Sequence, residues 1–271
     1  MRIFAGKKKA QKILLKLQKK IAQKKINPVL AVISVGRNPA SELFIKNKKQ
    51  AAENIGVEVR HFRFKEGVLA KKIIDKINCL NEDKKIHGII VQLPLPGKLN
   101  AGKIVGAINP LKDVDGFGLK TKFYSPLASA ILSALKDSVK NLSDKKIIAL
   151  VNSDFLGQSL KKFLKREKIK IAYLLRNKNW QVKMRKADVI ITVCGLPGLI
   201  KGECVKKKAA LIDAGIVVLK NRKVAGDVDR ASVEETISFL TPVPGGLGPL
   251  TVAYLLENVY LSAEKIYGFG N

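Results

Sequence analysis

Residues 145–159 read KKIIALVNSDFLGQS, an apolar strand that runs into a turn and then into a helix. The uninterrupted apolar run 147–151 is typical of a strand that is covered on both faces. Such strand–turn–helix units form the phosphate loop of dinucleotide-binding sheets, but those loops contain several glycines. Here Gly157 is the one glycine. The stretch therefore predicts a parallel α/β sheet whose phosphate loop is incomplete.

The same alternation of strands and helices continues on both sides of this stretch. We expect helices over 7–25, 40–55, 69–81, 100–108, 125–138, 156–167 and 251–268, and strands over 29–36, 57–64, 86–92, 145–151, 169–175, 187–195 and 207–217, with a hairpin around 216–226 and a short strand near 237–241. Alternating strands and helices imply parallel sheets with helices on both faces, so the fold class is α/β. The long loop 109–126, NPLKDVDGFGLKTKFYSP, marks the expected domain boundary.

The bulk composition is that of a globular protein. Of the 271 residues, 46% are hydrophobic and 27% are charged, which excludes a disordered chain. No apolar run reaches the roughly 18 residues that span a bilayer. The three cysteines lie far apart without a CxxC pair, so neither a disulfide framework nor a metal site is expected. We expect a cytoplasmic protein without a membrane partner.

The chain is strongly basic, with a formal net charge of +29 for 271 residues. Such a charge attracts nucleic acid, anionic membranes and anionic metabolites. However, the lysines are spread along the whole chain, as a compositional bias would also produce, and aromatic residues make up only 6%. Because dedicated nucleic-acid binders interleave aromatic and basic residues, no specific nucleic-acid partner is expected. The basic helix 7–25 has a narrow aliphatic stripe, which favours packing on a domain over lying on a membrane.

Polar residues that follow the expected strands are candidates for chemistry, because ligands bind beyond the carboxyl ends of the strands in α/β sheets. Lys48 follows the first strand, four residues after Phe44, so the two share one helix face. Gln92 ends the third strand, and Asp115 lies in the boundary loop. Taken singly, Lys48 reads as a solvated lysine, Gln92 as a strand cap, and Asp115 with its following glycine as a turn.

The ordered set of motifs resembles the methylenetetrahydrofolate dehydrogenase/cyclohydrolase family, the bifunctional enzymes of folate one-carbon metabolism. The resemblance rests on VGRNPAS (35–41), VQLPLP (91–96), KDVDGF (112–117), GDVD (226–229) and TPVPGGLGPLTVAYLLEN (241–258). It implies a three-layer α/β folate-binding domain over 1–119, completed by a returning helix over 250–271, and a Rossmann-like domain over 120–249. It further implies a homodimer and a folate site in the cleft between the domains.

The resemblance also implies the reactions and the site residues. Hydride passes from 5,10-methylenetetrahydrofolate to NADP⁺, or to NAD⁺, and water then opens the methenyl cation to 10-formyltetrahydrofolate. Lys48, Gln92 and Asp115 match the family's catalytic lysine, its glutamine partner and the carboxylate that holds the pterin. The matching folate contacts are Phe44, Pro244, Gly245, Gly246 and Gly248, and the matching cofactor positions are Val151, Asn152, Ser153, Gly157, Arg176 and Ile216.

Two departures from the family pattern bear on the activity. Phe44 stands where the family has tyrosine, so stacking on the folate remains but a hydroxyl is lost; that hydroxyl either aids alignment or shares in proton movement. In the phosphate loop, Val151 replaces the leading glycine and Asn152 replaces an arginine. Arg176 either replaces the lost charge or is a solvated loop residue. Val151 and Asn152 favour, as an alternative, a cyclohydrolase with weakened or lost dehydrogenase activity. The net charge of +29 leaves a more distant alternative, a basic nucleic-acid-binding protein on an enzyme scaffold.

Overall fold

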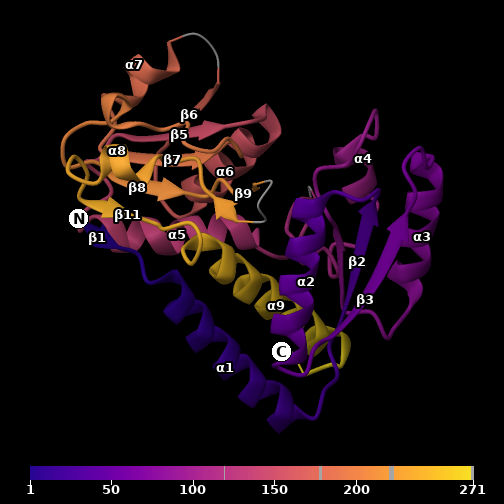
Figure 1. The fold of residues 1–271 in the computed structure, drawn as a ribbon. Coiled ribbons are helices and arrows are strands. Elements are labelled where there is room, and N and C mark those ends of the chain that lie inside the picture. Colours follow the sequence, from indigo (N-terminus) through magenta and orange to yellow (C-terminus); the bar gives the residue numbers. More distant parts are fainter. Residues whose placement is uncertain (119, 177–178, 220–222, 270–271) are drawn as a thin grey trace. The chain divides into compact units, whose positions relative to one another are not determined.

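The computed structural model describes residues 1–118, 120–176, 179–219 and 223–269, and the chain divides into two compact units (Figure 1). Unit 1 comprises residues 1–9 and 127–251, and unit 2 comprises residues 10–126 and 252–271. Residue 119, at which we expect the first domain to end, lies outside the described residues. Two helices, α1 (Gly6–Lys24) and α9 (Leu247–Ile266), contribute several residues to each unit.

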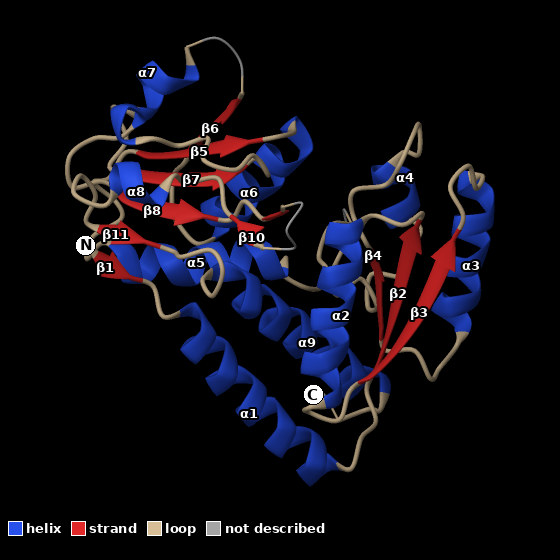
Figure 2. Ribbon diagram, viewed as in Figure 1, coloured by secondary structure: helices blue, strands red, loops and turns tan. Residues whose placement is uncertain are grey.

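Unit 2 is built on a three-stranded parallel sheet in the order β3–β2–β4. Its elements are β2 (Val29–Val35), α2 (Pro39–Glu53), β3 (Glu58–Phe64), α3 (Ala70–Glu82), β4 (Gly88–Val91) and α4 (Ala101–Val105). All seven residues of β2 are buried, because this central strand is covered on both faces. Leu30 and Val32 pack against α1, α2 and α9, whereas Ala31 and Ile33 pack against α3 and α4 (Figure 2). Unit 2 is thus a three-layer α/β unit that the C-terminal helix completes.

Unit 1 is built on a six-stranded sheet in the order β1–β11–β8–β7–β5–β6, and every neighbouring pair is parallel. Its elements are β1 (Arg2–Ile3), α5 (Pro126–Ser138, of which Pro126 belongs to unit 2), β5 (Ile147–Val151), α6 (Asp154–Arg166), β6 (Ala172–Leu175), α7 (Trp180–Met184), β7 (Val189–Val193), a 3₁₀ turn (Gly202–Cys204), β8 (Ala210–Asp213), the antiparallel hairpin β9 (Val217–Val218) and β10 (Val224–Ala225), α8 (Arg230–Val233) and β11 (Phe239–Leu240). Alternate residues of β5 enter a core shared with α7 and α8, and α6 covers the opposite face (Figure 2).

Both sheets reverse their strand order beside a fully buried strand, β5 in unit 1 and β2 in unit 2. In unit 1 the chain runs from β5 outward to β6 and then returns to the other side of β5 as β7. In unit 2 it runs from β2 to β3 and returns to the other side of β2 as β4. The crevice outside the carboxyl ends of the two strands at such a reversal is where ligands bind in open parallel sheets. The topology therefore indicates candidate ligand sites at the loops after β2 and β4 in unit 2, and at the loops after β5 and β7 in unit 1.

The α/β class with parallel sheets is confirmed, and most differences in detail are short elements. The helix expected from residue 156 begins at Asp154, because Ser153 caps it by accepting a hydrogen bond from the Leu156 N–H at 3.4 Å. Trp180 begins α7 and is buried, although the sequence around it is polar. Strand β1 has only two residues, too few for a periodic signal. The expected hairpin is confirmed by β9 and β10, and the turn residues 220–222 lie outside the described residues.

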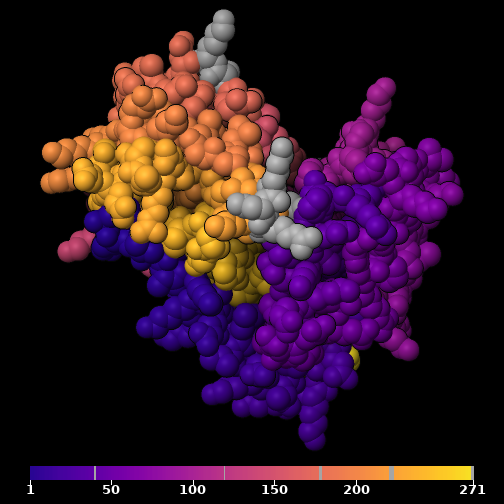
Figure 3. Space-filling view, in the orientation of Figure 1, coloured from indigo at the N-terminus to yellow at the C-terminus, as the bar shows by residue number. Residues whose placement is uncertain are grey.

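Helix α1 packs its aliphatic stripe into the unit 2 core and exposes its lysines. Leu17 and Ile21 are buried in that core, whereas Lys8, Lys12 and Lys16 are exposed. The indigo surface in Figure 3 includes part of this helix. Within the described part of the chain, no helix has the length and apolar character needed to cross a membrane.

Lys112 gives a test of how unit 2 is held together. Its buried Nζ donates to the main-chain oxygens of Leu80, Asn81 and Asp83 at the end of α3, at 2.6–3.0 Å. Hydrogen bonds from charged groups contribute about 1.5–3 kcal/mol. We expect Lys112→Met to lower the free energy of unfolding in urea by about 2 kcal/mol. Lys71→Met, which removes an exposed lysine on α3 itself, should change it by less than about 0.5 kcal/mol; equal effects would contradict this role for Lys112.

Candidate active site

Lys48 is the central residue of the candidate site in unit 2. It lies in the third turn of α2, whose start is fixed by Asn38, since the side chain of Asn38 accepts a hydrogen bond from the Ser41 N–H at 3.0 Å. The half-buried Lys48 side chain donates from Nζ to Oε1 of Gln92 at 2.9 Å. Helix α2 follows β2, and Gln92 follows β4. The bond therefore joins the two loops at the strand reversal of this sheet.

Gln92 is held by hydrogen bonds from its main chain and from its side chain. Its main-chain N–H donates to the Ile33 oxygen at 2.8 Å, which extends the pairing of β4 with β2 by one residue. Its Nε2 donates to the Leu93 oxygen at 2.8 Å. Because the amide nitrogen is engaged in this way, the amide oxygen is left to accept from Lys48. Gln92 thus orients the ammonium group without adding a charge.

Asp115 supplies the carboxylate of the site, and the loop around it is built by Asp113. The buried Asp113 carboxylate accepts hydrogen bonds from the N–H groups of Gly116 and Gly118, at 3.2 and 2.8 Å. From α9, Asn258 donates to the main-chain oxygen of Val114 at 2.8 Å. Neither Asp113 nor Asn258 is among the site residues predicted from the sequence. The KDVDGF pattern could have indicated Asp113, whereas Asn258 has no local signal.

The electrostatics of the site couple Lys48 to Asp115. Burial lowers the pKa of Lys48, and the charge of Asp115 opposes that shift to a smaller extent. Burial also raises the pKa of Asp115 to about 6, against the opposing effect of Lys48. The neutral amine of Lys48 is therefore more accessible near neutral pH than that of a solvated lysine. A neutral amine beside a fixed amide is suited to accept a proton or polarise a water molecule.

Phe44 lies one turn before Lys48 on α2 and is half-buried. Its ring offers an apolar surface on the helix face that carries Lys48.

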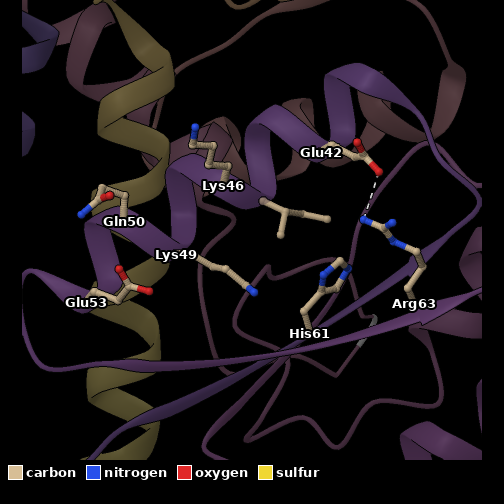
Figure 4. Close-up of a pocket in the computed structure, with 8 residues that line it drawn as sticks. Glu42, Lys46, Lys49, Gln50, Glu53, His61 and Arg63 are labelled. Atoms are coloured by element: carbon tan, nitrogen blue, oxygen red, sulfur yellow. Dashed lines mark ion pairs between the residues drawn. The ribbon is translucent and has the colours of Figure 1, made fainter.

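A second polar surface of α2 is separate from this cluster. A pocket of about 350 Å³ is lined by Glu42, Ile45, Lys46, Lys49, Gln50, Glu53, His61 and Arg63 (Figure 4). Several of its polar groups have partners nearby: Arg63 forms an ion pair with Glu42 at 3.0 Å, and His61 forms a hydrogen bond with Ser34 at 2.8 Å. Lys48 is not among the lining residues, so the pocket and the Lys48 cluster use different parts of the helix.

The incomplete phosphate loop in unit 1 lies at the strand reversal of its own sheet. Val151 ends β5 and is fully buried, and Asn152 and Ser153 are exposed before α6. The N-terminus of α6 favours an anion. Gly157 is buried one turn into this helix, and a Cβ there would overlap the ring of Tyr173 from β6. Gly157 therefore corresponds to the glycine that permits close helix–strand packing, and the loop lacks the glycines that let phosphate approach the main chain.

Asp154 also belongs to this loop and is not among the residues predicted from the sequence. It is the first residue of α6, and its carboxylate accepts a hydrogen bond from the Tyr173 hydroxyl at 2.5 Å and another from Gln158. A carboxylate in the first turn already complements the positive end of the helix dipole. A phosphate arriving at the same helix end would meet this negative charge.

Arg176 follows β6 and is exposed at the carboxyl edge of the unit 1 sheet. Burial raises the pKa of the Cys194 thiol at the end of β7 to about 11, and the charge of Arg176 partly opposes this effect. The guanidinium is thus near enough to the strand reversal to act on groups there. In classical dinucleotide folds a positive side chain near this place accommodates the 2′-phosphate.

The remaining candidate residues also belong to unit 1. Ile216 is half-buried in the loop after β8. Gly248 is its neighbour, since a Cβ on Gly248 would lie 3.4 Å from Cδ1 of Ile216. Pro244 and Gly245 are in the loop before α9, and the main-chain oxygen of Gly245 accepts from the Lys7 N–H at 2.9 Å. Gly246 is buried at the end of that loop, where its N–H donates to the Pro242 oxygen at 2.7 Å.

The structure thus brings Lys48, Gln92 and Asp115 together in unit 2, and it gathers the candidate cofactor residues along one edge of the unit 1 sheet. Across the described ranges, no group of three or more histidine, cysteine, aspartate or glutamate side chains is placed to hold a metal ion.

The raised pKa of Asp115 predicts how its replacement changes the pH dependence of stability. In the unfolded chain an aspartate ionises near pH 3.9, below the native value of about 6. As the pH rises from 4 to 6 the unfolded chain loses this proton first, so the native state loses stability. Asp115→Asn cannot ionise. We expect the unfolding free energy of the variant, minus that of the parent, to increase by about 2 kcal/mol between pH 4 and 6 in urea titrations and to stay flat below pH 3. A difference that is flat from pH 4 to 6 would contradict the burial of this carboxylate.

Comparisons with known proteins agree with this arrangement. Residues 4–115 match the family described as tetrahydrofolate dehydrogenase/cyclohydrolase, catalytic domain, and residues 125–267 match its NAD(P)-binding domain. The chain is 34% identical over 276 residues to the Bifunctional protein FolD of Wolbachia pipientis, which covers 96% of this chain and 94% of the relative.

Solved structures of enzymes from the same family are also similar to this chain. The bifunctional FolD enzyme of Campylobacter jejuni superimposes with a TM-score of 0.88 at 33% identity, covering 98% of this chain and 99% of that one. The Trypanosoma brucei enzyme, solved with NADP cofactor and an inhibitor, has a TM-score of 0.89 at 25% identity and covers 98% of both chains. The chain therefore belongs to the tetrahydrofolate dehydrogenase/cyclohydrolase family, whose members are enzymes of folate one-carbon metabolism.

Proposed function

We propose that this protein oxidises 5,10-methylenetetrahydrofolate to the 5,10-methenyl cation with NADP⁺ and then hydrolyses that cation to 10-formyltetrahydrofolate. The observation that carries the proposal is the hydrogen bond from the desolvated Lys48 to Gln92 beside Asp115. Membership of the family supports both halves of the reaction.

Lys48 is the proposed base of the hydrolytic half. A bound methenyl cation adds a positive charge near Lys48, which would lower the pKa of the lysine further than burial does. The neutral amine would then deprotonate or polarise the water that attacks the one-carbon bridge. Gln92 holds Nζ of Lys48 in place by its amide oxygen.

Asp115 and the remaining folate contacts hold the substrate. The Asp115 carboxylate would accept hydrogen bonds from the amino and ring N–H groups of the pterin. Phe44 would stack on the flat folate ring, and the loop of Pro244, Gly245, Gly246 and Gly248 would let the main chain approach it.

The residues on the unit 1 sheet edge fit a nicotinamide dinucleotide in part. The cofactor supplies the hydride acceptor when bound. The N-terminus of α6, with Ser153 as its cap, suits the pyrophosphate, and Arg176 supplies a positive charge for a 2′-phosphate. Ile216 would contact the nicotinamide end through its main chain. A relative solved with NADP supports NADP⁺ over NAD⁺ as the cofactor.

A second candidate is a cyclohydrolase with weakened or lost dehydrogenase activity. Val151 and Asn152 favour it, because a β-branched side chain precedes the phosphate position and the charged donor is missing. The Asp154 carboxylate at the start of α6 also favours it. Absorbance of reduced cofactor separates the two candidates: NADP⁺ turnover at the rate of ordinary family members would exclude this one.

Binding of nucleic acid is the more distant alternative, and it rests on the net charge of +29 and on the lysine face of α1. Salt-dependent binding of duplex or single strands by protein that binds no folate would support it. We favour a milder use of the charge, which is faster capture of anionic folates and nucleotides. No specific nucleic-acid partner is proposed.

We further propose that the protein is a cytoplasmic homodimer. The edge strand β3 leaves one row of main-chain groups without a neighbouring strand in its sheet, which offers a place for a second copy. The three cysteines are free, as expected in a reducing compartment. Light scattering of the purified protein measures the oligomeric state directly.

Replacing Lys48 tests the hydrolytic assignment. We expect Lys48→Met to lower the rate of methenyltetrahydrofolate hydrolysis by about 10²–10⁴-fold, because the general base is removed while the helix is kept. The loss of methenyl absorbance, corrected for the uncatalysed reaction, measures this rate.

The matched control is Lys49→Met, which changes the next lysine of α2, a residue that lines the separate pocket. It should hydrolyse methenyltetrahydrofolate at nearly the parent rate. If Lys48→Met keeps the parent rate as well, Lys48 is not the base.

Restoring a positive charge at position 152 tests the cofactor site. We expect Asn152→Arg to tighten NADP⁺ binding by about 10–100-fold, as one additional charged hydrogen bond would. Calorimetric titration measures this affinity, and Asn152→Gln, which lengthens the side chain without a charge, should bind like the parent. An unchanged affinity in Asn152→Arg would show that residue 152 does not face a cofactor phosphate.

A further inference from the structure

Two buried aspartates of unit 1 have no part in the proposed reaction. Asp213 ends β8 and is 2% exposed, and Asp227, in the GDVD motif, is fully buried. Neither forms an ion pair within the described ranges of the chain. A buried carboxylate is costly unless hydrogen bonds replace the lost water. Their partners therefore indicate what the two residues do.

Asp227 holds the end of β7. Its Oδ2 accepts hydrogen bonds from the Thr192 hydroxyl at 2.6 Å and from the Cys194 N–H at 2.7 Å. Its Oδ1 accepts from the Leu196 N–H at 2.7 Å. The carboxylate thus fixes two main-chain N–H groups of the loop that leaves β7 at the strand reversal.

Asp213 in turn holds the segment that carries Asp227. Its Oδ1 accepts from the N–H groups of Gly215 and Asp227, at 2.9 and 3.1 Å, and its Oδ2 accepts from the Val228 N–H at 3.0 Å. Burial and the nearby charge of Asp227 raise the pKa of Asp213 to about 7. The loop after β8 and the GDVD segment are therefore tied to one carboxylate.

Two glycines make this arrangement possible. A Cβ on Gly215 would overlap the Asp227 carboxyl, and a Cβ on Gly226 would overlap the Asp213 carboxyl. The Asp227 carboxyl thus lies against Gly215, two residues after Asp213. The Asp213 carboxyl lies against Gly226, the residue before Asp227. This reciprocal fit explains why glycine stands at positions 215 and 226.

We propose that Asp227, supported by Asp213, is a positioning residue for the nicotinamide cofactor: it clamps the loops after β7 and β8 in their binding arrangement before the nucleotide arrives. The inference rests on the proposed function, because it takes this sheet edge as the cofactor site. The clamped loops are those that border the strand reversal and that carry Ile216. A preformed site binds more tightly because less ordering remains to be done on binding.

The test is Asp227→Asn, with Asp188→Asn as the matched control. Asparagine has one acceptor oxygen, so one of the two N–H groups of the loop loses its carboxylate partner. Asp188 accepts hydrogen bonds from Lys146 and Lys206 and precedes β7, at the opposite edge of the sheet from Asp227. We expect Asp227→Asn to weaken NADP⁺ binding at least tenfold in calorimetric titrations. Asp188→Asn should bind NADP⁺ like the parent, and both variants should hydrolyse methenyltetrahydrofolate without nucleotide at the parent rate.

Hydrogen exchange separates positioning from general support. In the nucleotide-free parent the amides of Cys194 and Leu196 should both be protected. In Asp227→Asn at least one of the two should lose this protection and regain it with saturating NADP⁺. Parent affinity in Asp227→Asn, or unchanged protection of both amides, overturns the inference while the proposed function stands. A parent protein that binds neither NADP⁺ nor NAD⁺ overturns both.

A milder variant decides the question if Asp227→Asn does not fold. Thr192→Val removes one donor to Asp227 and keeps the shape of the side chain. We expect NADP⁺ affinity to fall about threefold to tenfold with parent hydrolysis, since one hydrogen bond contributes about 0.5–1.5 kcal/mol. Unchanged affinity in this variant also contradicts the clamp.

Discussion

The hydrogen bond from Lys48 to Gln92 is the contact on which the site in unit 2 depends. An ammonium group that is partly removed from water must find a partner, and the partner here is neutral. A carboxylate in the position of Gln92 would hold the lysine protonated, whereas the amide orients it and leaves its pKa lowered by burial. The charge of Asp115 limits this shift without reversing it. Gln92 thus sets the orientation of the Lys48 side chain, whereas burial and the charge of Asp115 set its pKa.

The same construction principle recurs in the two units. Each sheet is parallel and reverses its strand order beside a fully buried strand, and each places its polar side chains in the loops beyond the carboxyl ends. In each unit a buried aspartate shapes the loop by accepting main-chain N–H groups: Asp113 does so beside Asp115, and Asp227 does so at the end of β7. These aspartates carry no proposed chemistry of their own. They hold the main chain of the loops that carry the residues with proposed roles in binding or catalysis.

Periodicity alone was sufficient to predict the α/β class and nearly all of the longer elements, because a parallel sheet demands continuous apolar strands such as β2 and β5. Two-residue strands such as β1 gave no signal, since their pairing is decided by partners far along the chain. The pairing of Lys48 with Gln92 was also beyond periodicity: spacing alone makes Lys48 a surface lysine, and only the resemblance placed it in a site. The roles of Asp154 and Asp227 required coordinates, because each depends on side chains or N–H groups from another strand. The roles of the site residues remain predictions that the variants above address.

The protonation of Lys48 is the most direct test of this account. Competitive acetylation at a series of pH values, with each lysine identified by mass spectrometry, gives the pH at which the Lys48 amine becomes reactive. The account predicts a midpoint below about 10.4, the value for a lysine in water, because burial disfavours the charged form. A midpoint at or above that value would contradict it, since Lys48 would then be an ordinary solvated or charge-stabilised lysine and could not serve as the base.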